Sequence, residues 1–153
     1  NIYMFMAEDY SGSKLCHKDD LVFNIMWAWM GALGVSDRTG IVSPSYGVYR
    51  QLHEGTFNSW YLENLLRSGQ YVAEYNRRST GLHSSRLRLY PDMFFDMELG
   101  FPPKEEQDSI EKAVGETTAD IDSAVRAVEA EIEVLTEYRN IISADSVTGK
   151  SKL

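Results

Sequence analysis

The residues best suited to contact a charged ligand lie between Arg67 and Arg88. This stretch contains five arginines and His83, and Glu74 is its only carboxylate. Guanidinium groups bind phosphates or pair with guanine in the major groove, and hydroxyl groups suit phosphate oxygens and base edges. A solvated loop whose arginines pair with Glu74 or Asp92 is the alternative. The candidate DNA-binding residues are Arg67, Arg77, Arg78, Ser79, Thr80, His83, Ser84, Ser85, Arg86 and Arg88.

The charge of the chain is unevenly distributed along the sequence. The net charge is −8, but residues 104–153 hold 12 acidic and 6 basic side chains, against 11 acidic and 9 basic in residues 1–103. Phosphate contact depends on a local basic patch rather than on the total charge. The acidic balance therefore does not exclude a nucleic-acid partner for the first hundred residues.

Two segments only partly match motifs for phosphate or metal chemistry. Residues 147–151 end like a phosphate-binding P-loop, but the first glycine of that motif is replaced by Ala144. Asp92, Asp96 and Glu98 are similar to the acids of a metal-dependent nuclease, but Gly100 occupies the position of the required lysine. We expect neither a P-loop nor a nuclease site here.

The histidines and the single cysteine give no sign of a metal centre. His17, His53 and His83 have no ligand spacing among themselves or with Cys16. No serine lies in a Gly-x-Ser-x-Gly elbow. We therefore expect a non-catalytic chain with no metal site and no cofactor of its own.

The last third of the chain predicts one long helix. Pro102 and Pro103 suit a helix start, and residues 104–144 contain no proline and only one glycine, Gly115. Apolar residues then recur at steps of three and four, with Thr117 and Arg139 filling the gaps and one stutter near Ile121, which indicates a coiled coil. Such a rod, roughly 60 Å long, needs a partner helix. Ordinary core packing is the alternative. The seam consists of Ile110, Val114, Ile121, Val125, Val128, Ile132, Leu135 and Ile142.

The first hundred residues predict an α+β domain with a twisted, mostly antiparallel sheet. Residues 21–30 form either a strand buried on both faces or a sharp bend, and residues 41–50 form a strand interrupted at Pro44. Thr56 can cap a helix that ends at Gly69, and a short helix follows over 71–77. Residues 86–90 alternate in polarity, and 94–99 predict a last strand. We place the domain over 1–101 and the long helix with a polar tail over 102–153.

The apolar runs and the cysteine content of the sequence bear on where in the cell the protein works. The longest apolar run, residues 25–35, is too short to cross a membrane, and no signal peptide is visible. Cys16 is the only cysteine, which excludes a disulfide within the chain. We expect a cytoplasmic protein.

Several segments together resemble a known family. Residues 20–34 contain the pattern Asn24-x-Met-x-x-Trp29-x-Gly31, residues 40–50 follow as a strand, and residues 101–110 begin with Phe-Pro-Pro-Lys-Glu-Glu. Residues 135–139 and 147–150 add a C-terminal signature. In this order they resemble the DNA-specificity subunits of type I restriction–modification systems, over nearly all of residues 19–150.

The resemblance implies a function for each part. The globular part would be a target-recognition domain that reads half of a bipartite site in double-stranded DNA. The long helix would be a spacer that packs antiparallel on a second spacer helix and holds the methyltransferase (modification) subunits. Those subunits would bind S-adenosylmethionine and methylate adenine, and a restriction subunit using ATP and Mg²⁺ would cleave. A coiled-coil scaffold without a nucleic-acid role is the alternative.

The chain also departs from the family pattern. The family usually carries two recognition domains and two spacer helices, so we expect either a C-terminal fragment or a half-subunit that pairs with a second copy. DNA-contact residues vary across the family, so none is carried over as a base reader. Asn24, Trp29 and Gly31 are assigned to the fold.

Overall fold

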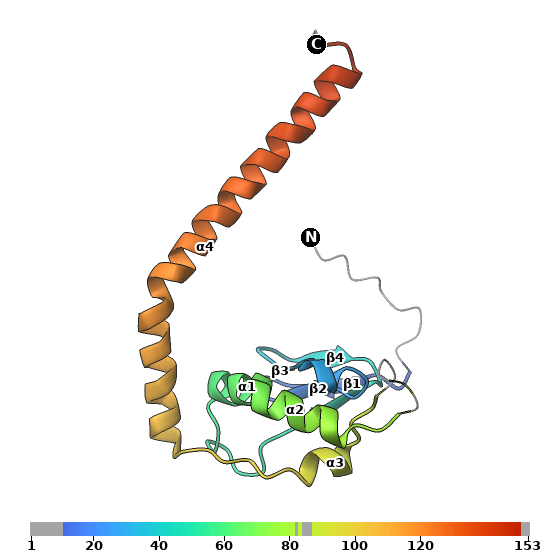
Figure 1. Cartoon of the computed structure of the whole chain (residues 1–153), viewed down its shortest axis with the longest axis vertical. Helices are drawn as coiled ribbons and strands as arrows, with labels where there is room; N and C mark the ends of the chain where they lie inside the picture. The colour runs from blue at the N-terminus through green and yellow to red at the C-terminus, as the bar shows by residue number, and fades with distance from the viewer. Residues whose placement is uncertain (1–10, 82, 84–86, 151–153) are drawn as a thin grey trace. The chain divides into compact units, whose positions relative to one another are not determined.

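The computed structural model describes residues 11–81, 83 and 87–150 of the 153 (Figure 1). The chain has an α+β fold, with small antiparallel sheets first and one long helix last. Its contacts divide it into two compact units, Asn1–Glu111 and Lys112–Leu153. Within the described residues, no helix is both long and apolar enough to cross a membrane.

The strands of the first unit form two small sheets in the described part of the chain. All pairings are antiparallel, and the three-stranded sheet has the order β3-β2-β5. A separate pair, β1 and β4, aligns Leu15 with Ile41. The strands are β1 (Lys14–Cys16), β2 (Leu21–Asn24), β3 (Leu33–Val35), β4 (Gly40–Val42) and β5 (Tyr46–Tyr49).

The apolar run after Leu21 is a strand followed by a sharp bend, so the bend alternative is right for its second half. The side-chain oxygen of Asn24 accepts hydrogen bonds from the N–H groups of Met26 (3.0 Å) and Trp27 (3.2 Å), which turns the chain out of β2. The short 3₁₀ helix η1 (Ala28–Met30) follows and ends at Gly31, whose φ of 75° favours glycine.

The predicted strand over 41–50 is interrupted as expected, because β4 and β5 are separated by Ser43, Pro44 and Ser45. The interruption moves the chain from the two-stranded to the three-stranded sheet. The ring of Tyr49 lies over Gly47, where an added Cβ would come within 2.4 Å of the tyrosine hydroxyl oxygen. Any larger residue at position 47 would require the Tyr49 ring to move.

Two consecutive helices, α1 (Ser59–Arg67) and α2 (Gly69–Arg78), follow the sheets. The predicted cap, Thr56, is wrong: its hydroxyl donates to the carbonyl oxygen of His53 (2.8 Å). The cap is Asn58, whose side-chain oxygen accepts from the N–H of Tyr61 (2.9 Å). An asparagine oxygen satisfies a free N–H of the first turn as well as a threonine does.

The core lies between the three-stranded sheet and these helices. Phe23 of β2 and Tyr75 of α2 are fully buried and meet edge to face, with ring centroids 5.8 Å apart. The hydroxyl of Tyr75 donates to the carbonyl oxygen of Leu66 (2.8 Å), which satisfies the one polar group of the pair. Leu62 and Leu89 belong to the same buried cluster.

The strand predicted over 94–99 is wrong, because this region contains a short helix, α3 (Pro91–Phe95). Pro91 occupies its first turn, where a missing N–H costs nothing, and Asp92 suits the positive end of the helix. Phe94 packs against Phe23 and Tyr49, at centroid distances of 4.9 Å and 5.5 Å. Instead of extending as a strand, the chain forms one helical turn here that places Phe94 on the core.

The last helix, α4 (Lys104–Val147), is 44 residues long and starts directly after Pro102 and Pro103, as predicted. Gln107 is the one buried residue of this helix, all of which is described. Its Oε1 accepts from the N–H of Asn58 (2.9 Å), and its Nε2 donates to the carbonyl oxygens of Thr56 (3.1 Å) and Pro102 (2.8 Å). The side chain of Asn58 also donates to Asp108 (2.7 Å) and Glu111 (2.6 Å).

We predict that Gln107→Ala lowers the free energy of unfolding of the globular unit by about 1–3 kcal/mol, because it leaves the Asn58 N–H and two carbonyl groups without partners. Urea unfolding followed by tryptophan fluorescence measures this change. The control is Ser109→Ala, which removes an exposed hydroxyl bonded within α4 and should cost less than about 0.5 kcal/mol. Equal destabilisation of the two variants would contradict the role of Gln107.

Candidate functional site

Two of the candidate arginines are held in ion pairs at the end of α2. Nη2 of Arg77 lies 2.6 Å and Nε of Arg78 lies 3.0 Å from the same oxygen of Glu74. Arg78 also reaches Asp96, with 2.9 Å between Nη1 and Oδ2. The pairing expected for a solvated loop is thus present, with Asp96 rather than Asp92 as the second acid.

The electrostatics of this cluster favour its charged state. Hydrogen bonds from Arg77 and then Arg78 lower the pKa of Glu74 to about 2. The same bonds raise the pKa of both guanidinium groups. The side chain of Arg77 is 65% exposed whereas that of Arg78 is 23% exposed, so Arg77 is the more accessible cation.

Of the other two described arginines among the candidates, Arg67 is held in an ion pair and Arg88 is exposed to solvent. Arg67 ends α1 and binds Glu63 (2.8 Å), whose second oxygen accepts the N–H of Val35 (2.9 Å) on the edge strand β3. Arg88 pairs through its backbone with Thr80, at 3.0 Å and 2.9 Å. The side chain of Arg88 is exposed and has no ion-pair partner among the described residues.

The remaining candidates are placed only in part. His83 is exposed. The hydroxyl oxygen of Ser79 is buried and has no hydrogen-bond partner within the described part of the chain. Ser84, Ser85 and Arg86 lie outside the described residues, so their role stays a prediction. The structure thus brings Arg77, Arg78, Thr80 and Arg88 to the same end of α2.

Sequence reasoning missed a second charged cluster, at the end of β5. Asp20 is 1% exposed, and its carboxylate accepts from Nε and Nη2 of Arg50 (2.7 Å each) and from the N–H of His17 (2.7 Å). The hydrogen bonds from Arg50 lower the pKa of Asp20. Arg50 also contacts Nδ1 of His17 (2.6 Å). No sequence pattern links residues thirty positions apart, so this cluster could not be predicted.

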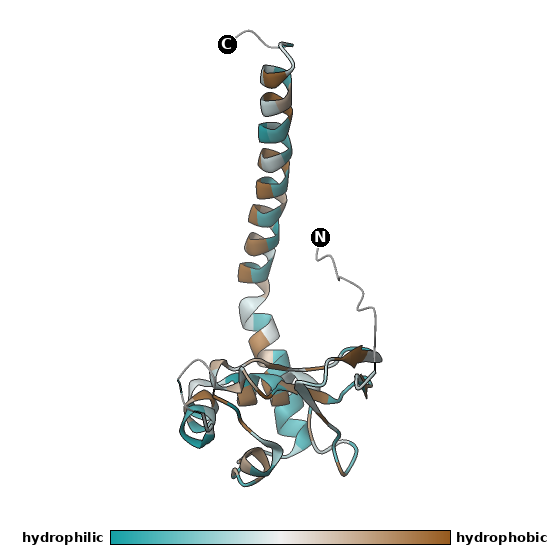
Figure 2. Ribbon diagram, turned by 90° about the vertical axis from the view of Figure 1, so that its right-hand side faces the viewer, coloured by the Kyte–Doolittle hydropathy of each residue, from teal (hydrophilic) through white to brown (hydrophobic). Residues whose placement is uncertain are grey.

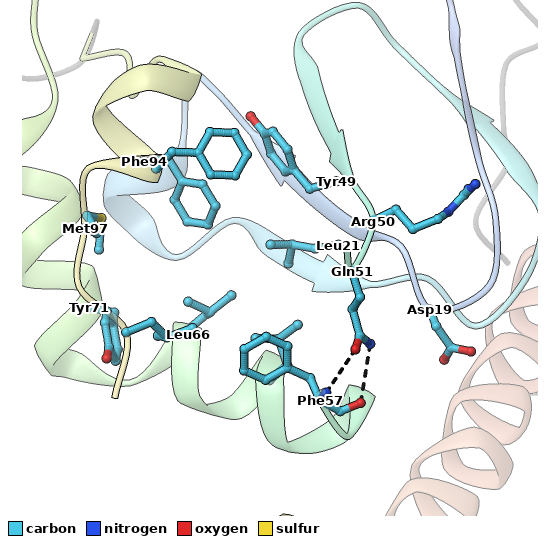
Figure 3. A pocket seen from close by; sticks show the side chains of 13 residues that line it. Asp19, Leu21, Tyr49, Arg50, Gln51, Phe57, Leu66, Tyr71, Phe94 and Met97 are labelled. Atoms are coloured by element: carbon cyan, nitrogen blue, oxygen red, sulfur yellow. Dashed lines mark hydrogen bonds between the residues drawn. The ribbon is translucent and has the colours of Figure 1, made fainter. Parts of the chain in front are cut away.

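An apolar cavity of about 230 Å³ lies beside the core (Figure 3). Leu21, Phe57, Leu66 and Phe94 line it, from β2, the loop before α1, α1 and α3. Figure 3 shows the side chain of Gln51 turned toward Phe57, whose backbone it bonds at 2.9 Å and 3.4 Å. The cavity offers apolar contact, and none of the candidate arginines lines it.

The apolar surface of α4 is open to water along the helix. Figure 2 shows apolar and polar segments alternating along it. Ile121, Val128 and Leu135 of the predicted seam are 63%, 53% and 57% exposed. Val134, Tyr138 and Ile141 are also exposed and apolar, and sequence reasoning left them out. Their spacing of four and three residues is the sequence signal that could have predicted this second apolar strip beside the seam.

Comparisons with known proteins do not assign the chain. Neither a scan against protein-family models nor a search of curated proteins finds a match. Among the residues that the structure describes, no group of three or more His, Cys, Asp or Glu side chains could hold a metal ion.

We predict that Glu74 keeps its charge well below the usual glutamate range. Its folded pKa is depressed, so its stabilising contribution is present above the unfolded pKa of about 4.5 and disappears as the pH falls toward about 2. A ¹³C NMR titration of its carboxyl group measures the midpoint. In the Arg77→Ala, Arg78→Ala double variant the midpoint should rise toward 4.5. An unchanged midpoint in that variant would contradict the ion pairs.

Proposed function

We propose that this chain is a specificity component of a type I restriction–modification complex, in which the globular unit reads a half-site in double-stranded DNA and α4 docks partner subunits. The observation that carries the proposal is an α+β unit with exposed arginines that continues into a 44-residue helix with an exposed apolar seam. The sequence patterns at residues 20–34, 40–50 and 101–110 support the same assignment.

The proposed DNA surface is centred on the end of α2 and the segment after it. Arg77 and Arg88 offer exposed guanidinium groups, and Thr80 lies beside Arg88 through their backbone pairing. To contact a phosphate, Arg77 would exchange its ion pair with Glu74 for an ion pair with an anion of DNA. The pair with Glu74 lies on the surface and contributes little to stability. The arginines would supply positioning contacts with the backbone, which set affinity rather than sequence preference.

The proposed partners of α4 are helices and subunits rather than small molecules. A second spacer helix would cover the seam, and methyltransferase subunits and a restriction subunit would join the complex. In this proposal S-adenosylmethionine, ATP and Mg²⁺ bind to those subunits. This chain would supply recognition and geometry only.

A coiled-coil scaffold without a nucleic-acid role is the second candidate function. It is favoured by the pairing of Arg67, Arg77 and Arg78 with Glu63, Glu74 and Asp96, which reduces the positive potential of the proposed surface. The two functions differ in one measurable property, affinity for double-stranded DNA. Co-expression with a modification subunit, followed by selection of bound duplexes from a randomised pool, tests it: an enriched motif supports recognition, and a complex that enriches nothing supports the scaffold.

We predict that replacing Arg77, Arg78 and Arg86 together by Ala weakens binding to the selected duplex. Fewer counterions are released when fewer phosphates are bound, so the slope of log K against log salt should fall by about 0.9 for each phosphate that the variant no longer binds. Fluorescence anisotropy over a series of salt concentrations measures both quantities.

The matched control is the triple variant Arg38→Ala, Lys112→Ala, Arg126→Ala, which removes the same charge outside the candidate residues. Its salt slope should stay near that of the parent chain. Equal slopes for the two triple variants would show that net charge, not the proposed surface, governs binding.

We predict that Val128→Asp or Leu135→Asp abolishes association with the partner helix, because a lone carboxylate in an apolar seam is costly to bury. Light scattering of the mixture measures the mass of the complex. Ala130→Asp places the same group on the opposite face of α4 and should leave the mass of the complex unchanged. A complex of unchanged mass with Leu135→Asp would exclude the seam as the binding surface.

A further inference from the structure

The charges beside the α4 seam are all of one sign. The residues on either side of the seam from Ile121 onward, which we call the flanks, include four carboxylates and no basic side chain. In a coiled coil these positions face the partner and set which partner is preferred. The flanks are Asp122, Ala124, Glu129, Glu131, Thr136, Tyr138, Ser143 and Asp145.

The basic residues of the helix are elsewhere. Between Lys112 and Val147 there are three basic and eight acidic side chains. Lys112 lies 3.9 Å from Glu116 of its own helix, and Arg126 follows a seam residue on the outer side. Arg139 occupies a position within the seam. A second copy of α4 therefore has no basic flank residue to place beside Glu129 or Glu131.

Arg139 adds a requirement of its own. A polar residue at a seam position fixes the register of a coiled coil and is costly unless the partner supplies a complementary group. In either orientation the seam of a second copy has no carboxylate to place against Arg139, and in parallel register Arg139 would meet the same arginine. A partner with a carboxylate at this position would neutralise it.

We infer that the α4 seam is covered by a partner helix whose flanks carry lysine or arginine, rather than by α4 of a second copy. Four flank carboxylates then gain basic neighbours, and the excess of negative charge on α4 is balanced. This deepens the partner side of the proposed function and rests on α4 being the docking element there. Of the two arrangements expected from the sequence, it favours a second, different spacer helix over a pair of identical half-subunits.

The test uses the full chain and two synthetic helical peptides of equal length. Both carry the same apolar seam; one has lysine at every flank position and the other has glutamate. At low salt the chain should bind the lysine-flanked peptide about tenfold more tightly, since pairs of opposite charge stabilise and like pairs destabilise by similar amounts. The preference should shrink as salt rises. Titration calorimetry measures both affinities, and sedimentation shows whether the chain alone is a monomer.

Two charge-reversed variants separate flank contacts from net charge. Glu129→Lys with Glu131→Lys should remove most of the preference for the lysine-flanked peptide. Glu133→Lys with Glu137→Lys changes the net charge equally on the outer face and should keep it. Circular dichroism confirms that each variant stays helical.

Three outcomes would overturn the inference: equal binding of the two peptides, equal effects of the two variants, or a chain that dimerises in preference to binding either peptide. No DNA is present in this test. A chain that prefers the lysine-flanked peptide but enriches no duplex would therefore contradict the proposed DNA role and support the inference.

Discussion

At the buried amide of Gln107 the chain changes from a folded domain to a helix whose side chains are not buried in a core. This amide is fully buried, it bonds three backbone groups, and the rest of α4 contains no buried residue. Before this point a cluster of apolar side chains, including Phe23, Leu66 and Leu89, is buried in a core. After it, apolar side chains such as Ile132 and Leu135 are more than half exposed. A helix of this length gains most of its stability from packing, so the exposed seam creates a need for another chain or segment.

The same division explains where the negative charge of the chain lies. Within the globular unit, carboxylates such as Asp20 and Glu74 form ion pairs with arginines, so their negative charge is neutralised by neighbouring side chains. Among the described residues most acids of α4 have no such partner, and four of them lie beside the seam. The acidic composition, which argues against nucleic acid when taken as a total, is mainly a property of residues 104–153, which include α4.

Local patterns in the sequence predicted the elements whose causes are local. The start of α4 after Pro103, the interruption at Pro44 and the two central helices each depend on neighbours within a few residues. The strand over 94–99 and the cap at Thr56 were wrong because two local signals competed, and tertiary packing of Phe94 and bonding of Asn58 decided between them. The Asp20–Arg50 and Gln107–Asn58 contacts join residues 30 and 49 positions apart, and no pattern in one sequence encodes them. The candidate arginines were predicted by type, but the pairing of Arg78 with Asp96 needed the fold.

The ion pairs at the end of α2 hold Arg77 and Arg78 to different degrees. Exposed ion pairs contribute little to stability, because water and salt screen them. Exchanging Glu74 for a phosphate is therefore inexpensive for Arg77, which is 65% exposed and has one acidic partner. For Arg78 the exchange is harder, because it is 23% exposed and bound to both Glu74 and Asp96. If the surface contacts DNA, Arg77 and Arg88 would carry the counterion release while Arg78 holds the end of α2 to α3. The ion pair with Glu74 would then orient the guanidinium group of Arg77 before a phosphate binds.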